Sequence, residues 1–195
     1  GFSYETTLKN DIKSGPHNVI LKAIDKTGNH QELTLEFIVD PIPNTISTEI
    51  ENNRVMPSES LKVKVLLYVQ ANNLIQDKVS IEIYDVKGKK RFSQLTDTNT
   101  LVEFPIDQFA VSGKWTIKSY SKGLSREDAF YVGEVSTVDV SLEGSILIIR
   151  NIGNNKYENP ISVSLEGGGN LYKIVKKTSL SSNQIMEIDL AKEAT

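Results

Sequence analysis

Apolar and polar residues alternate with a period of two along most of this 195-residue chain, which predicts β-strands. In residues 61–69 the aliphatic side chains that share one face are Leu61, Val63, Val65, Leu67 and Val69. Residues 79–86 repeat the pattern, with Val79, Ile81 and Ile83 on the inward face. Turn residues separate such runs every ~10–15 residues, a spacing typical of antiparallel sandwiches.

The pattern divides into individual strands as follows. The expected strands cover residues 46–52, 60–69, 79–86, 90–96, 100–106, 114–121, 126–132, 136–142, 145–150, 160–166, 171–177 and 184–190, and a further hairpin is expected within residues 15–39. One turn of helix is predicted at residues 106–111. The fold class that follows is all-β, in tandem antiparallel sandwiches.

Three blocks are expected along the chain: residues 1–43, 44–133 and 134–195. Pro41 and Pro43 lie at the first boundary, where they stiffen an extended connector and cannot donate to a strand ladder. The second block carries enough strand patterns for a whole sandwich. The first and third are each expected to be incomplete, which favours a piece of a longer tandem array.

The first block presents an apolar face with few strands in sequence to cover it. This candidate assembly surface consists of Val19, Leu21, Leu33, Leu35 and Phe37. A two-stranded ribbon is marginal in water unless something covers its apolar side. We therefore expect completion from outside the segment, either by an upstream part of the same chain or by a neighbouring subunit, with a homo-oligomer or lattice as the second outcome.

Composition excludes several classes of function. The net charge of −3 gives no footprint for nucleic acid. The basic run at residues 87–91 contains a turn glycine and is interpreted as a solvated hairpin tip. Cysteine is absent, which removes disulfides, thiolate nucleophiles and thiolate-ligated zinc. No apolar run is long enough to predict a membrane span in this segment.

No residue carries a catalytic, metal or cofactor assignment. His17 and His30 lie at the two ends of one expected strand, and ~3.3 Å per residue places them too far apart to share a metal. Asp25 to Asn29 offers few oxygen ligands for calcium, so a hairpin turn with positive φ at Gly28 and Asn29 is preferred and calcium is the weaker alternative. Trp115 alternates with Ile117 and is expected in the core. The glycine run at residues 166–170 is expected to be a hairpin and not a phosphate loop.

Turn and strand signatures in each block resemble modules of known surface proteins. Gly15, His17, Asp25, Gly28 and Asn29 resemble the end of a bacterial or archaeal immunoglobulin-like repeat. The second block resembles macroglobulin-like and related immunoglobulin-like modules through its Pro57-x-Glu59-x-Leu61, Tyr84-Asp85-x-x-Gly88 and Ser112-Gly113-Lys114-Trp115 stretches. Residues 147–167, with an Asn-x-Gly-Asn turn and a later Asn-Pro, are similar to adhesion-related domains. The chain has no thioester motif, so a complete macroglobulin-type protease trap is not implied.

The resemblance implies immunoglobulin-like sandwiches in an extracellular, multidomain prokaryotic protein at the cell surface, plausibly archaeal. The expected function is non-enzymatic: a structural or assembly segment of a surface layer, surface filament or adhesin, partnered by other modules of its chain or by neighbouring subunits. Two alternatives stay open. One is an accessory stalk of a secreted protease or glycosidase, and the other is a glycan- or protein-binding module.

Overall fold

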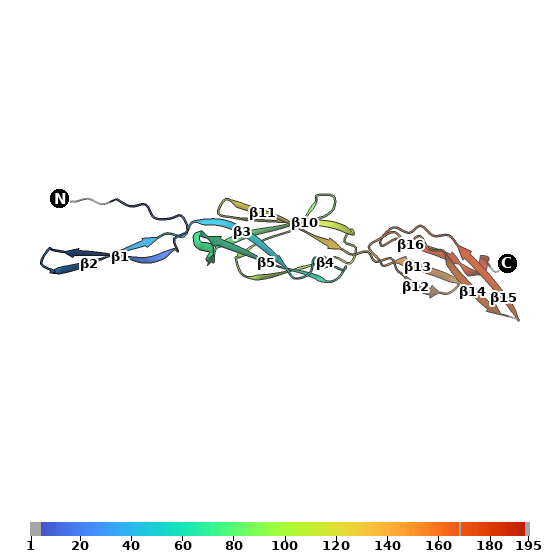
Figure 1. Ribbon diagram of the computed structural model, residues 1–195. Coiled ribbons are helices and arrows are strands. Elements are labelled where there is room, and N and C mark those ends of the chain that lie inside the picture. The colour runs from blue at the N-terminus through green and yellow to red at the C-terminus, as the bar shows by residue number, and fades with distance from the viewer. Residues whose placement is uncertain (1–4, 168, 194–195) are drawn as a thin grey trace.

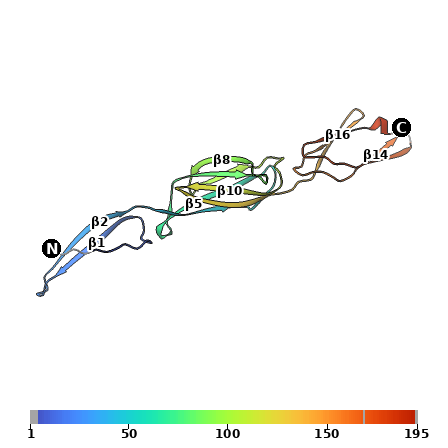
Figure 2. The ribbon, with the colours of Figure 1, turned by 90° about the horizontal axis from the view of Figure 1, so that it is seen from above.

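The computed structural model describes residues 5–167 and 169–193. Three groups of strands follow one another along one long axis, with the two ends of the chain far apart, in both views of the ribbon (Figures 1 and 2). Sheet pairing falls within three ranges, residues 15–39, 43–132 and 138–189. The protein is all-β, as predicted, and almost every described element is a strand.

The first range holds a two-stranded antiparallel sheet, β1 (Gly15–Ile24) and β2 (His30–Val39). Asp25 closes the turn between them, because its Oδ1 accepts from the backbone N–H groups of Thr27 and Asn29. Gly28 has φ +91° there, whereas Asn29 is not among the positive-φ residues, so that part of the prediction was wrong.

The second range is a sandwich of two sheets. Its strands are β3 (Pro43–Ile50), β4 (Arg54–Val55), β5 (Ser60–Val69), β6 (Leu74–Ile75), β7 (Lys78–Tyr84), β8 (Lys90–Asp97), β9 (Leu101–Pro105), β10 (Gly113–Ser121) and β11 (Leu124–Val132). One sheet has the order β4-β11-β10-β7-β8, and the other pairs β3, β6 and β9 with β5. The alternating residues of both sheets meet in one core, where Leu61, Val63, Ile81 and Ile117 are fully buried.

The third range holds two smaller sheets and a smaller core. Its strands are β12 (Val138–Glu143), β13 (Ile146–Asn151), β14 (Ile161–Gly167), β15 (Asn170–Lys176) and β16 (Ile185–Asp189). The orders are β12-β13-β16 and β14-β15. Ile149, Leu180 and Ile188 form the buried centre.

Two details depart from the sequence prediction. Residues 106–111 form a turn closed by the Ala110 N–H on the Asp107 carbonyl, not a turn of helix. The short helices lie elsewhere, at η1 (Gln70–Asn72) and α1 (Leu190–Glu193), so the strand predicted over residues 184–190 ends at Asp189. The predicted hairpin at residues 166–170 is the turn between β14 and β15, and Gly168 within it lies outside the described residues.

Candidate assembly surface and inter-block joints

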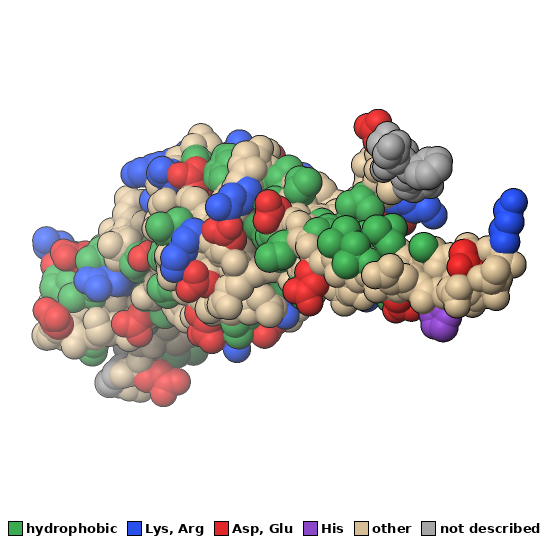
Figure 3. Space-filling view, turned by 90° about the vertical axis from the view of Figure 1, so that its left-hand side faces the viewer, with side chains coloured by type: hydrophobic (Ala, Val, Ile, Leu, Met, Phe, Trp, Pro, Cys, Tyr) green, Lys and Arg blue, Asp and Glu red, His purple; other side chains and the backbone are tan. Residues whose placement is uncertain are grey.

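The five residues of the candidate assembly surface share one face of the β1–β2 hairpin. Val19 is paired with Leu35, Leu21 with Leu33, and Phe37 with His17. Val19, Leu21, Leu33 and Leu35 are 41–53% exposed, and Phe37 is half-buried. Figure 3 shows hydrophobic side chains gathered in one patch on the arm that carries a histidine. The structure thus brings the predicted residues together and leaves them open to solvent.

The opposite face of the hairpin is mixed in character. Lys22 and Glu32 are directly opposed and form an ion pair of 2.9 Å. Ile20 and Ile38 are exposed on this side as well. Only the other face has two neighbouring aliphatic pairs, Val19 with Leu35 and Leu21 with Leu33, so that face is the one that favours a covering layer.

The connector between the first and second blocks is held by a buried amide. The Gln70 side chain, at the start of η1, is 8% exposed. Its Nε2 donates to the Asp40 carbonyl at 2.8 Å, and its Oε1 accepts from the Ile42 N–H at 2.7 Å. The connector is therefore fixed by a side chain from the second block as well as by the prolines noted in the sequence.

The connector between the second and third blocks is held in the same way by Asn154, which is 7% exposed. Its Nδ2 donates to the Ala110 and Gly133 carbonyls, both at 2.8 Å, and its Oδ1 accepts from the Val135 N–H at 2.7 Å. Next to it, a Cβ at Gly153 would overlap the Val135 carbonyl, so the close backbone approach requires glycine.

Asn151, which is fully buried, fixes the loop that presents Asn154. Its Nδ2 donates to the Asn155 and Leu180 carbonyls, and its Oδ1 accepts from the Gly153 N–H. The Asn-x-Gly-Asn stretch is thus a joint, a role that sequence analysis did not assign. The sequence shows only two asparagines on either side of a glycine just after a strand. This pattern does not reveal that the carbonyls to which Asn154 donates lie in another block.

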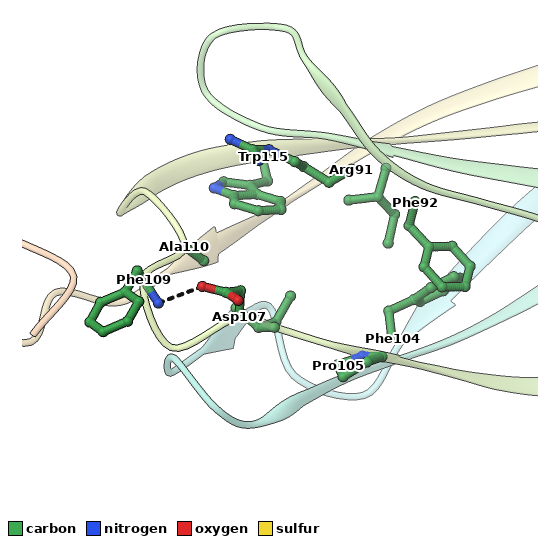
Figure 4. A pocket seen from close by; sticks show the side chains of 10 residues that line it. Arg91, Phe92, Phe104, Pro105, Asp107, Phe109, Ala110 and Trp115 are labelled. Carbon is green, nitrogen blue, oxygen red and sulfur yellow. Dashed lines mark hydrogen bonds between the residues drawn. The ribbon is translucent and has the colours of Figure 1, made fainter. Parts of the chain in front are cut away.

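A pocket of about 260 Å³ opens at the end of the sandwich (Figure 4). Trp115 and Arg91 lie on one side and Phe104 and Pro105 on the other. Its charged groups are already engaged, because the Asp107 carboxylate accepts from the Phe109 N–H and Arg91 pairs with Asp85 at 2.6 Å. Ligand sites typically have free polar groups and volumes of ~300–1,000 Å³, so this pocket does not favour a ligand.

Trp115 is a core residue, as predicted, with 3% exposure and its Nε1 donating to the Val111 carbonyl. Residues 87–89 lie at the exposed hairpin tip expected for the basic run. Arg91 instead pairs with Asp85, whose side chain is fully buried. Burial raises the pKa of Asp85, but the Arg91 guanidinium and the backbone N–H groups of Lys89 and Lys87 together lower it by more. The pKa of Asp85 therefore lies below its usual value.

His17 and His30 lie at opposite ends of the hairpin, paired with Phe37 and Ile24 respectively. Among the described residues, no group of three or more His, Cys, Asp or Glu side chains could hold a metal ion. No helix within the described ranges is long and apolar enough to cross a membrane.

No family model and no curated protein matches the chain. The α2-macroglobulin of E. coli, a solved structure, aligns with 95% of this chain at 11% identity and a TM-score of 0.42. A Salmonella α2-macroglobulin aligns with 90% at 11% identity and a TM-score of 0.42. The tandem repeats in the extending region of a large adhesion protein align with 90% at 13% identity and a TM-score of 0.38.

The chain spans 17% of the length of the two macroglobulin chains and 48% of the adhesion-protein chain. With TM-scores below 0.5, these likenesses assign neither a family nor an activity to it. The sandwich fold itself follows from the sheet pairing and the shared core described above.

Proposed function

We propose that this chain is a non-enzymatic structural segment of an extracellular prokaryotic surface protein, acting as a stiff spacer that holds other parts of its assembly apart. The observation that carries the proposal is that a buried amide side chain clamps each of the two connectors. Gln70 clamps the connector at Asp40–Ile42, and Asn154 clamps the one at Gly133–Val135. Flexible linkers leave their backbone groups to water, so buried partners at both joints favour a rod.

Removing the Asn154 side chain tests the role of the joint. Asn154→Ala leaves the Ala110 and Gly133 carbonyls and the Val135 N–H without their partner. Each buried group left unsatisfied costs about 1–3 kcal/mol, enough to loosen the contact without unfolding either block. Small-angle scattering of residues 1–195 should show a shorter maximum dimension and a broader distance distribution for this variant.

Asn155→Ala is the matched control. Among the described residues, the neighbouring Asn155 side chain makes none of the Asn154 contacts, and its backbone groups are retained in the variant. It should scatter like the wild type. If the scattering profile of Asn154→Ala is the same as that of the wild type, the stiff-spacer function is wrong.

The accessory-stalk alternative shares this geometry, since a stalk is also a stiff spacer. It differs in requiring a catalytic domain elsewhere in the natural protein. An intact-mass measurement combined with protease and glycosidase assays on that protein separates the two, because hydrolase activity in a much larger chain would favour the stalk.

A further inference from the structure

The base of the β1–β2 hairpin repeats the base of β10–β11. Gly15 and Gly113 open the first strand of each hairpin, each follows a serine, and their φ angles are +112° and +123°. Gly15 pairs with Val39 and Gly113 pairs with Val132, the last residue of the second strand in both cases. Positive φ at a strand's first residue is a specific backbone feature that alternation does not require.

Two residues further on, each hairpin has a pair of facing rings, stacked in the first hairpin and tilted in the second. His17 is directly opposite Phe37 with ring centroids 5.5 Å apart, and Trp115 is opposite Phe130 at 5.9 Å. Each first ring also bonds the carbonyl four residues before it. His17 Nε2 donates to the Lys13 carbonyl at 2.7 Å, as Trp115 Nε1 donates to the Val111 carbonyl at 2.8 Å.

The hairpins differ toward their tips. A five-residue turn with Asp25 closes β1–β2, whereas Lys122 and Gly123 close β10–β11. The inner face of β1–β2 stays apolar at Leu21 and Leu33, where the second block has Ser119 opposite Arg126. Ser119 is fully buried, so a layer over β1–β2 covers the same level but meets apolar side chains there.

The second block shows what covers a hairpin of this kind. The outer edge of β10 pairs with β7 in antiparallel fashion over Thr116–Tyr120, and β11 pairs in parallel with β4 at Tyr131 and Val132. Trp115, Ile117 and Phe130 pack in the core with residues of β3, β5 and β9. All of these partner strands precede β10 along the chain.

We infer that residues 13–39 are the closing hairpin of a sandwich built like residues 43–132, and that strands preceding residue 1 on the same longer chain cover its apolar face. The incoming edge strand runs antiparallel to β1 along residues 18–22, the positions equivalent to 116–120. A second strand lies parallel to β2 at residues 38–39, equivalent to 131–132. This deepens the proposed function, on which it rests, by identifying the partner of the assembly surface.

Hydrogen exchange on two chains tests the inference: residues 1–195 alone, and the natural full-length protein that contains them. The backbone amides of residues 18–22 that point away from β2 should exchange at least about 100-fold more slowly in the full-length protein, because edge amides become bonded. The same is expected of the Ile38 and Asp40 amides, the equivalents of the Tyr131 and Gly133 amides that donate to the Asn53 and Val55 carbonyls. Equal exchange in both chains overturns the inference. The inference is also overturned if these amides are protected in residues 1–195 alone and their protection increases with protein concentration, because a second copy would then be the partner.

Substitutions at two adjacent residues of β1 distinguish the roles of its two faces. Val19 and Ile20 are 41% and 53% exposed and point to opposite sides of β1. In the full-length protein, Val19→Lys should restore fast exchange at these edge amides of residues 18–22, Ile38 and Asp40, while Ile20→Lys should keep their exchange slow. In residues 1–195 alone, both variants should exchange as the wild type does.

These outcomes are independent of the joint test. Exchange at β1 and β2 reports the covering layer, whereas scattering of Asn154→Ala reports the second joint. Equal effects of Val19→Lys and Ile20→Lys in the full-length protein would overturn the inference and leave the stiff-spacer function intact.

Discussion

The first hairpin and the second block carry the same alternating pattern, yet the inward face is exposed in the first and buried in the second. Ile117 is fully buried, whereas Val19, at the equivalent position of the first hairpin, is 41% exposed. The difference lies in the opposing sheet, which the second block supplies from β3, β5 and β9. Alternation therefore specifies which side chains share a face, and a second layer decides whether that face is a core or a surface.

The turns of two hairpins show the same contrast. Asp25 and Asp85 each accept backbone N–H groups two and four residues later, and each carbonyl accepts from the glycine three residues later. Asp85 is buried and pairs with Arg91, while Asp25 is exposed and bonds the Asn29 and Thr27 side chains. One local turn thus serves in two different electrostatic environments.

The largest expected difference is between separate fragments. Residues 43–133 should unfold in one cooperative transition, because they contain both sheets of the sandwich. Residues 5–42 should show no such transition, since an isolated two-stranded hairpin is marginal in water. Thermal melts followed by circular dichroism check both, and a cooperative melt of residues 5–42 would break the comparison.

Truncating the equivalent positions should give the next largest difference within residues 1–195. Ile117→Ala removes a fully buried side chain and should lower the free energy of unfolding by about 2–5 kcal/mol. Val19→Ala removes an exposed one and should change it by less than about 0.5 kcal/mol. Urea titration measures both, and comparable losses would mean that the hairpin face is already covered.

Substitution of the two equivalent turn aspartates, Asp85 and Asp25, should give a smaller difference in the free energy of unfolding. Asp85→Ala removes a buried carboxylate with bonds to Arg91, Lys87 and Lys89 and should cost about 2–3 kcal/mol. Asp25→Ala should cause a clearly smaller loss, because water replaces the bonds of an exposed carboxylate. The same urea titrations check this order, which a greater loss for Asp25→Ala would reverse.

Acid titration gives a smaller, local effect. The Asn29 and Thr27 side chains lower the pKa of Asp25 from 3.8 to about 2. Because the folded pKa is depressed, the stabilisation is present above pH 3.8 and is lost as the pH falls toward 2. A carboxyl titration of Asp25 by NMR should therefore have its midpoint near pH 2. The Asn29→Ala variant should move that midpoint upward, and an unchanged midpoint would show that the Asn29 side chain does not lower the pKa of Asp25.

The smallest expected effect is that of metal removal. Calcium takes six to eight oxygen ligands, and the Asp25 carboxylate is already occupied by four donors in its own turn. Adding a chelator to residues 1–195 should leave the melting temperature unchanged. A shift of more than a few degrees would identify a calcium site that the hairpin turn alone does not explain.

The strand pattern of the second block was predictable because burial on one side imposes a period of two. β5 covers residues 60–69 as predicted, and β7, β8, β10 and β11 each begin or end within two residues of the prediction. The two-residue strands β4 and β6 were missed, since a pair of residues has no period. The helix predicted at residues 106–111 failed because Asp107 bonds the Phe109 N–H and closes a turn.

The sequence by itself determined the all-β class, the inward faces, the hairpin turns and the clustering of Val19, Leu21, Leu33, Leu35 and Phe37, because these follow from bonding and periodicity between near neighbours. The joints were decided by the tertiary structure alone. Gln70 reaches Asp40 and Asn154 reaches Ala110 across 30 and 44 residues of sequence. An amide carries no mark of a partner so distant, because that partner is defined only when the intervening strands have folded.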